Sequence, residues 1–305
     1  TDNTINIIKD TFDSLNIPGK LHNKEWKDFS TNRNYVIEEA EKDSKYLLFF
    51  DADDSFSGNF KLPDLSHDAY LMRFGPDFVW HRIFIVNTKY KWRYKGILHE
   101  YIVCDNPYFN KVTITGNYYI VPGTHGCRSK DPEKYLNDAL VFEKAILSKD
   151  TPKDLFGRYT YYCAQSYKDC GNMERAIEFY KKTLSTDAWV QEKYIACNNL
   201  GNYYKHKDVN MAIKYYLESR KYDPTRVECT LELSRLINDI KIKFKILTSI
   251  EASSIANPVS DKYLFIDIPT HNVFYFNEVM IFGYKLGEWD VVCDYLIEQV
   301  KRLKN

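Results

Sequence analysis

The chain has 305 residues, and 44% of them are hydrophobic, which is enough material for the cores of two domains. Lysine plus arginine and aspartate plus glutamate number 42 each, so the net charge is zero. A neutral chain without a dense basic run has no broad positive field to attract nucleic acid or anionic lipid. Apolar runs fall short of the ~20 residues that span a bilayer. We therefore expect no nucleic-acid partner and no membrane span.

The cysteines number seven, which is odd, and no Cys-x-x-Cys motif occurs among them. Their spacing fits neither a disulfide framework nor a zinc cluster. Reduced thiols in a cytosolic protein are the simplest explanation. A secretory signal peptide is not visible. The sequence thus predicts a cytoplasmic location.

The N-terminal part begins with a helix and a short strand. Apolar residues at helical spacing predict a helix over residues 5–15, with Asp2 or Asn3 as its cap. A short strand is expected at residues 19–22. A domain seldom opens abruptly on a capped helix, which suggests that a strand upstream of Thr1 is missing from this chain.

The next segment leads into a group of carboxylates. Ser30 or Thr31 can cap a second helix that runs to about Glu41. Residues 45–50 form a short, largely apolar run with aromatics, which predicts a strand buried on both faces. This run ends in Asp51-Ala52-Asp53-Asp54. The alternation of helices and strands indicates an α/β sheet.

The segment that follows is rich in β-branched and aromatic residues, with turn residues between its apolar runs. The runs predict strands at residues 70–74, 79–86, 101–104 and 112–121. After Arg128 the composition becomes helical, and Asp131-Pro132-Glu133 is a typical helix start. We predict an α/β domain over residues 1–128 and an all-α domain over residues 129–305.

The C-terminal part contains an internal repeat with a shift of 36 residues. The shift aligns Tyr167 with Tyr203, Ala176 with Ala212, and Asp187 with Asp223. Helix pairs of about 34 residues, with small residues where the helices cross, are typical of tetratricopeptide repeats. A degenerate third unit is expected from Thr225, and a similar turn from Gly287. A generic helical bundle is the alternative.

The Asp51-Ala52-Asp53-Asp54 motif is the first candidate for chemistry. In open α/β sheets, ligands bind at the carboxyl ends of strands. Two carboxylates at i and i+2 in a turn can converge on Mg²⁺ or Mn²⁺, which would also bind the oxygens of a diphosphate. Such an ion would neutralise charge that develops on a nucleoside-diphosphate leaving group. An acidic turn without function is the alternative, because Asp-x-Asp alone is common.

Three further side chains are candidates. Glu100, beside His99 in an apolar stretch, can act as a general base, or the two can face water on an edge strand. His125, in a turn after a strand, can supply a third metal ligand or be a loop histidine with structural hydrogen bonds. Arg33 can pair with a phosphate or lie on the surface. Aromatic residues that can stack on sugar faces, or simply fill the core, are Phe78, Trp80, Trp92 and Tyr94.

Four motifs in order carry a resemblance to a known family. They are Thr1-Asp2-Asn3-Thr4, Trp26-Lys-Asp-Phe29-Ser-Thr-Asn-Arg33-Asn34, Leu47-Leu-Phe-Phe-Asp51-Ala-Asp53-Asp54, and Gly96-Ile-Leu-His99-Glu100. In this order and rough spacing the chain resembles family 2 glycosyltransferases of the GT-A fold, in the branch with C-terminal tetratricopeptide repeats. The resemblance implies a GT-A-like, Rossmann-like mixed sheet followed by helical repeats. It also implies a first strand and an Asp-Thr-Gly upstream of Thr1.

The resemblance implies a function and roles for particular residues. The donor would be a nucleotide sugar, usually a uridine diphosphate sugar, and transfer would invert the anomeric carbon. A divalent ion, Mn²⁺ or Mg²⁺, would lie at Asp51 and Asp53, with Asp51 also near the ribose and Asp2 and Arg33 contributing to donor binding. A carboxylate would deprotonate the acceptor hydroxyl or thiol, and Glu100 is the main candidate. Asp77 and Asp54 are the alternatives.

Two other functions remain open at this point. The chain can be a repeat-based interaction protein whose catalytic part is degraded or incomplete, which the missing first strand favours. It can also be a metal-dependent phosphotransferase or nuclease, although the neutral charge argues against nucleic acid. For the transferase we expect a protein, peptide or glycan acceptor. The concave surface of the repeats can bind a partner or mediate a homodimer.

Overall fold

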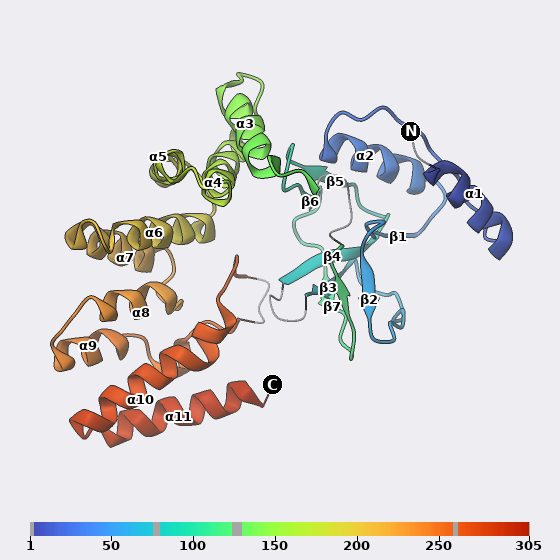
Figure 1. Cartoon of the computed structure of the whole chain (residues 1–305). Helices are drawn as coiled ribbons and strands as arrows, with labels where there is room; N and C mark the ends of the chain where they lie inside the picture. Colours follow the sequence, from blue (N-terminus) through green and yellow to red (C-terminus); the bar gives the residue numbers. More distant parts are fainter. Residues whose placement is uncertain (1–2, 76–79, 124–129, 259–261, 305) are drawn as a thin grey trace. The chain divides into compact units, whose positions relative to one another are not determined.

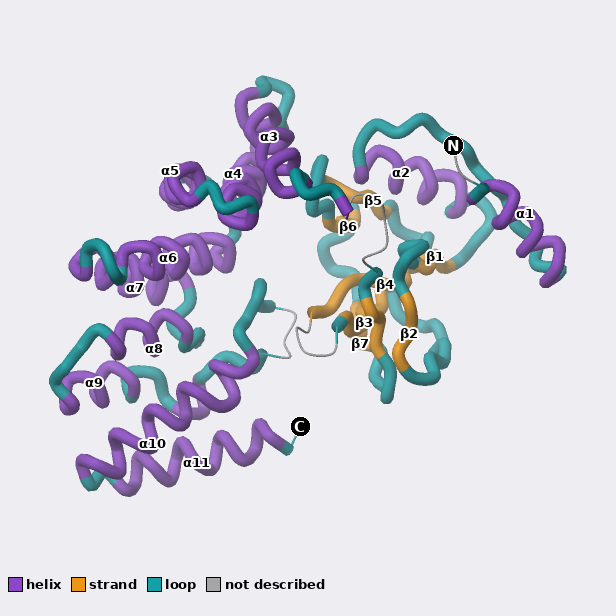
Figure 2. The backbone as a smooth tube through the Cα atoms, viewed as in Figure 1, coloured by secondary structure: helices purple, strands orange, loops and turns teal. Residues whose placement is uncertain are grey.

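The computed structural model describes residues 3–75, 80–123, 130–258 and 262–304. The chain forms two compact units (Figure 1). Unit 1 comprises Thr1–Asp51, Lys61–Met72 and Ile83–Thr115, and unit 2 comprises Ala52–Phe60, Arg73–Arg82 and Gly116–Asn305. In the described chain, all strands precede the helix α3, and the remainder of the chain is helical (Figure 2). An α/β segment followed by an all-helical segment agrees with the predicted fold class at this level.

The N-terminal segment contains two helices and eight strands within the described residues. The helices are α1 (Thr4–Leu15) and α2 (Phe29–Ala40). The strands are β1 (Tyr46–Leu48), β2 (Ser55–Ser57), β3 (Ala69–Phe74), β4 (Trp80–Asn87), β5 (Trp92–Lys95), β6 (Tyr101–Cys104), β7 (Lys111–Thr113) and β8 (Tyr119–Val121).

The sheet is mixed. Its strand order is β1-β4-β3-β8-β2, and β7 pairs with β3 outside this path. The β1–β4 and β2–β8 pairs are antiparallel, whereas β7 and β8 run parallel to β3. Strands β5 and β6 form a separate antiparallel pair, in which Trp92 lies opposite Cys104. In unit 1, α2 packs on β5, and the core there includes Ile37, Leu47 and Tyr94.

The helix starts differ from the prediction. α2 begins at Phe29, and its cap is Asp28, whose carboxylate accepts a hydrogen bond from the Thr31 backbone N–H at 2.7 Å. The predicted caps Ser30 and Thr31 are therefore wrong, because the extended backbone at Asp28 already turns its side chain toward the free N–H groups. At α1 the cap position is Asn3, but its side chain makes no capping hydrogen bond.

Three of the four strand predictions in this segment were right. The strands predicted at residues 70–74, 79–86 and 101–104 correspond to β3, β4 and β6. The predicted 112–121 strand is split into β7 and β8, and residues 19–22 form no strand. β1 is not buried on both faces: Leu47 is buried, but Leu48 is 47% exposed. Successive side chains of a strand point to opposite faces, so one face of β1 is covered while the face that carries Leu48 is largely open.

The C-terminal segment consists of successive packed helices. They are α3 (Lys134–Leu147), α4 (Lys153–Asp169), α5 (Met173–Leu184), α6 (Val190–Tyr204), α7 (Val209–Tyr222), α8 (Glu228–Arg235), α9 (Ile240–Leu247), α10 (Tyr275–Leu286) and α11 (Trp289–Leu303). From α3 to α9 each helix packs on the next, and α10 packs on both α9 and α11 (Figure 1). Packing between sequence neighbours is the pattern of a helical repeat.

The 36-residue repeat corresponds to the pairs α4–α5 and α6–α7. Ala176 and Ala212 are fully buried at equivalent positions, where a small residue lets the helices approach. Tyr180 and Tyr216 are likewise fully buried one turn later. The shorter pair α8–α9 lies where the degenerate third unit was predicted. The tetratricopeptide type itself stays a prediction, as does the domain boundary after residue 128, which falls outside the described residues.

Candidate functional site

Arg33 joins two of the predicted site residues in unit 1. Its Nη2 donates a hydrogen bond to Asp51 Oδ1 at 2.7 Å, and its Nε donates to Glu100 Oε1 at 2.8 Å. The three side chains are partly buried, with exposed fractions of 25% for Arg33, 30% for Asp51 and 13% for Glu100. Charge-assisted pairs of this length in a half-buried site hold their groups in one orientation. We name this set the Arg33 carboxylate cluster.

The residue after Arg33 fixes the helix that carries it. The Asn34 side chain donates from Nδ2 to the Tyr94 carbonyl at 2.9 Å and accepts from the Tyr94 N–H at 2.6 Å. This pair of bonds attaches α2 to the backbone of β5. The Arg33 guanidinium also lies over the Tyr94 ring, 5.2 Å from its centroid. The dipeptide Arg33-Asn34 therefore combines a charged group with the side chain that holds it in place.

The start of α2 is stabilised by Asp28. Its carboxylate accepts from the backbone N–H and the hydroxyl of Thr31 and from the hydroxyl of Ser30. Burial alone would raise the pKa of Asp28, but these hydrogen bonds outweigh burial and lower it from its ordinary value. The charged carboxylate also lies at the positive end of the helix dipole. The cap thus anchors the helix one turn before Arg33.

Glu100 is placed by an unusual turn between β5 and β6. Gly96 has φ 109°, and His99, which is not glycine, has φ 50°. A Cβ at Gly96 would lie 3.4 Å from the Glu100 Cα, so the backbone passes close to itself here. A left-handed residue other than glycine costs about 1–3 kcal/mol, and such strain is concentrated at functional sites. The turn therefore holds Glu100 in a defined position directly before β6.

Asp51 follows β1 on a short extended segment. The Phe49 N–H donates to the Phe84 carbonyl at 2.9 Å, and the Phe49 ring packs edge-on against Tyr94 at 5.6 Å. Burial by itself would lower the pKa of Arg33, but nearby negative charge, chiefly that of Asp51, raises it above its ordinary value. The guanidinium therefore stays charged between the two carboxylates.

Asp53 and Asp54 belong to unit 2, where the chain turns against Gly123. The Gly123 N–H donates to Asp54 Oδ1 at 3.0 Å. A Cβ at Gly123 would lie only 2.0 Å from the Asp53 carbonyl oxygen, a distance at which the backbone must shift. Only glycine permits this close approach. Asp54 thus acts as a structural acceptor, and Gly123 supports the turn that carries Asp53.

The carboxylates suit a hard divalent cation by chemistry. Mg²⁺ in proteins is commonly bound by one or two carboxylates together with the phosphates of the substrate. Asp51 and Asp53 supply such a pair, although each is described within its own unit. Among the residues that the structure describes, no group of three or more His, Cys, Asp or Glu side chains is arranged to hold a metal ion. A divalent ion at this motif therefore stays a prediction.

Residues 1–135 match the family described as Glycosyl transferase family 2. The match covers the whole segment that holds the Arg33 carboxylate cluster and Asp53. It supports a glycosyltransferase, with a nucleotide-sugar donor and an acceptor, and agrees with the resemblance seen in the sequence.

Comparisons with individual proteins add little. A search of curated proteins gives no match. Among solved structures, "Crystal structure of BtubC (BKLC) from P. vanneervenii" is 15% identical, with 59% of this chain and 74% of that chain covered and a TM-score of 0.37. A likeness at that level carries no argument about fold or function.

The structure describes some of the predicted site residues and not others. Arg33, Asp51 and Glu100 lie together, and the Arg33 guanidinium hydrogen-bonds to the two carboxylates. Three predicted residues lie outside the described residues, and their roles stay predictions: Asp2, Asp77 and His125. No helix in the described ranges is long and apolar enough to cross a membrane.

The predicted aromatic platform is mostly core. Trp92 is 5% exposed, and its Nε1 donates to the Asn87 carbonyl at 2.9 Å. Trp80 stacks on Phe74 with ring centroids 5.6 Å apart. Tyr94 is also buried, but it supports Arg33, a role that the sequence did not reveal.

Proposed function

We propose that the N-terminal segment transfers a sugar from a nucleoside-diphosphate sugar, most simply a UDP-sugar, to a hydroxyl or thiol of an acceptor, with inversion and with metal assistance. The family match over residues 1–135 supports the donor and the acceptor as classes. The observation that carries the proposal is the Arg33 carboxylate cluster, because it positions one carboxylate of the Asp-x-Asp motif and one candidate base on a single guanidinium.

Glu100 is the proposed general base. In the reaction its carboxylate takes the proton from the acceptor hydroxyl while the acceptor oxygen forms a bond to the anomeric carbon. The bond from that carbon to the diphosphate oxygen breaks on the opposite face, and its electron pair leaves with the nucleoside diphosphate. Attack from the face opposite the leaving group inverts the anomeric carbon. Asp54 is less suited to this role because its Oδ1 accepts from the Gly123 N–H.

Arg33 is proposed to position both carboxylates. Two negative side chains that share a site repel each other, and a guanidinium between them removes that repulsion. Its planar fork can bind two acceptors at once, which the point charge of lysine does not do with the same geometry. Asp51 and Asp53 would hold Mn²⁺ or Mg²⁺ when the donor binds. The ion would neutralise charge on the diphosphate as it leaves.

Calorimetric binding of nucleoside diphosphates, with and without Mn²⁺, tests the donor site. We expect metal-dependent binding of one nucleotide, and we expect Asp53→Ala to abolish it. Glu100→Gln should leave nucleotide binding intact but stop sugar transfer. Glu41→Gln is the matched control, since Glu41 is also paired with a basic side chain in unit 1, Lys91, at 2.7 Å.

Two results would contradict the proposal. Unchanged Mn²⁺-dependent binding in Asp53→Ala would remove the motif from the site. Full transfer activity in Glu100→Gln would move the base to another residue, with Asp77 as the next candidate. An interaction module with a degraded catalytic part is not favoured, because Arg33, Asp51 and Glu100 are retained and in contact.

The helical segment is proposed to be of the tetratricopeptide type, which the burial of Ala176 and Ala212 supports. A homodimer through this segment is a further proposal. Its support is a row of exposed apolar side chains on α11, including Leu296, Val300 and Leu303. Light scattering of the purified chain over a concentration series tests it, and a monomer at every concentration would exclude it. The cytoplasmic location stays a prediction.

A further inference from the structure

The helical part of unit 2 contains a cavity of about 750 Å³. One wall is a face of α6 from Ile195 to Asn202, continued by Lys205 directly after the helix, and the others come from α4, from α8 and from the segment Phe265–Phe274. Ile195 lies three and four positions before Asn198 and Asn199, and Asn202 lies three and four positions after them, so these residues form one continuous stripe along the helix. Ten residues of helix extend about 15 Å. The cavity is therefore an elongated groove of the size that binds a small ligand.

Four carboxamide side chains contribute to the polar lining of the groove. They are Gln165, Asn198, Asn199 and Asn202. Asn199 and Asn202 are held from behind by the hydroxyls of Tyr180 and Tyr216, at 3.2 and 2.9 Å. In the described part of the chain, Asn198 Oδ1 is buried without a hydrogen-bond partner. A buried amide oxygen that lacks a partner costs free energy, which a ligand that donates a hydrogen bond would recover.

The lining contains four cationic and three anionic side chains, and three of the cations are paired with carboxylates. Lys205 pairs with Glu232 at 2.8 Å, and Arg235 pairs with the other oxygen of the same carboxylate at 2.5 Å. Arg226 pairs with Glu228 at 2.6 Å. An anionic ligand would have to compete with these carboxylates. The groove therefore favours a ligand that is polar but uncharged.

Two aromatic rings supply flat apolar surface in the same lining. Phe265 is 43% exposed and Phe274 is 52% exposed. Phe265 has φ 46°, a left-handed backbone that is uncommon for a bulky residue. Its carbonyl accepts from Arg226 at 3.4 Å, so the strained segment is held by the buried guanidinium. A ring that is kept exposed by strained backbone indicates a contact surface rather than core.

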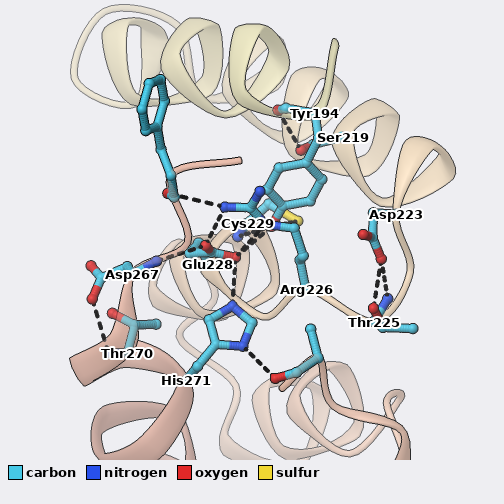
Figure 3. A network of polar contacts seen from close by, with 12 residues as sticks. Tyr194, Ser219, Asp223, Thr225, Arg226, Glu228, Cys229, Asp267, Thr270 and His271 are labelled. Atoms are coloured by element: carbon cyan, nitrogen blue, oxygen red, sulfur yellow. Dashed lines mark hydrogen bonds and ion pairs between the residues drawn. The ribbon is translucent and has the colours of Figure 1, made fainter. Parts of the chain in front are cut away.

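A rigid polar network forms the floor of the groove (Figure 3). Arg226 is only 2% exposed and also donates to the carbonyl of Leu264 at 2.8 Å. His271 Nε2 lies 2.9 Å from Glu228 Oε2. The Asp267 N–H donates to the same carboxylate at 3.3 Å. The network attaches the segment that carries Phe265 to the start of α8, so the walls of the groove keep their spacing.

We propose that this groove binds a neutral oligosaccharide of two or three sugar rings. A sugar ring offers apolar C–H faces for the aromatic rings and neighbouring hydroxyls that both donate and accept, as the carboxamides do. A nucleotide or an acidic peptide would require uncompensated cations, whereas three of the four cations here are paired with carboxylates and the fourth, Lys168, donates to the Asn199 side chain at 3.2 Å. The proposal concerns a second site in the helical segment and requires no nucleotide sugar.

The test uses the full chain and an array of neutral glycans, followed by calorimetry with the best neutral trisaccharide and with polyglutamate peptide. We expect saturable binding of a trisaccharide and none of polyglutamate. Asn198→Ala and Phe274→Ala should each raise the dissociation constant of the trisaccharide about tenfold, which corresponds to about 1.4 kcal/mol of binding free energy. Asn210→Ala on α7 and Trp289→Ala on α11 are matched controls, since both residues are exposed and lie outside the groove lining. Both control variants should bind the trisaccharide with wild-type affinity.

Three outcomes would overturn the proposal. The first is an array on which no neutral glycan binds. The second is trisaccharide binding that survives both groove substitutions. The third is binding of polyglutamate that is lost on Asn198→Ala, which would assign the groove to an acidic peptide instead. Because no nucleotide is present in these assays, their failure is separate from a failure of the transferase proposal.

Discussion

Replacing Glu228 with glutamine should destabilise the helical segment strongly. Glu228→Gln keeps the shape of the side chain but removes the negative charge that lies opposite Arg226. Arg226 would then be a positive charge at 2% exposure with only neutral partners. Breaking one side of a buried ion pair costs about 3–5 kcal/mol, because the remaining charge is uncompensated. We expect a loss of that size in the free energy of unfolding at neutral pH.

The assay is urea unfolding followed by far-UV circular dichroism. The double variant Arg226→Met with Glu228→Gln is the informative control, since it removes both charges. It should be more stable than the sum of the two single losses predicts, by a coupling energy of about 0.5–3 kcal/mol. A loss below about 1 kcal/mol in Glu228→Gln, or strict additivity in the double variant, would refute the view that this pair holds the groove floor together.

The ion pair between Arg226 and Glu228 also predicts that the stability of the chain depends on pH. Burial alone would raise the pKa of Glu228, but His271 and Arg226, through charge and hydrogen bonds, lower it well below its ordinary value of 4.5. A carboxylate with a lowered pKa contributes stability above its unfolded pKa and loses it as the pH falls below that value. The wild-type chain should therefore lose stability progressively below about pH 4.5, while Glu228→Gln lacks this component.

Two further predictions concern the N-terminal segment. Asp28→Ala should lower the stability of unit 1 by about 0.5–2 kcal/mol. Asn3→Ala should lower it by much less, because of these two cap residues only Asp28 makes a capping hydrogen bond. Equal losses of stability in thermal unfolding would contradict this prediction. Since the pKa of Asp28 is lowered in the folded chain, its contribution should be present above its ordinary value of 3.8 and disappear as the pH falls through the folded pKa. Gly123→Ala should displace the backbone of Asp53 and weaken Mn²⁺-dependent nucleotide binding about tenfold or more. The far-UV circular dichroism of this variant should be normal. An unchanged affinity would show that the turn tolerates the added methyl group.

Local patterns in the sequence were sufficient to predict several of the helices and strands and to recognise the four motifs in order. β3 and β6 appear where runs rich in aromatic and β-branched residues predicted them, and the paired helices follow the 36-residue spacing. Such features depend on residues a few positions apart, so they can be recognised without knowledge of the fold. The candidates Asp51 and Glu100 were also found in this way, from the residues next to them in the chain.

Contacts between distant residues could not be found in that way. Arg33 meets Asp51 and Glu100, which are 18 and 67 positions away, only because α2 is attached to β5 through Asn34. The exposure of Leu48 depends on which face of β1 is covered by the rest of the chain. The groove likewise combines α4, α6, α8 and a strained loop. Each of these depends on which surfaces pack together, and packing is decided by burial summed over the whole chain rather than by neighbouring residues.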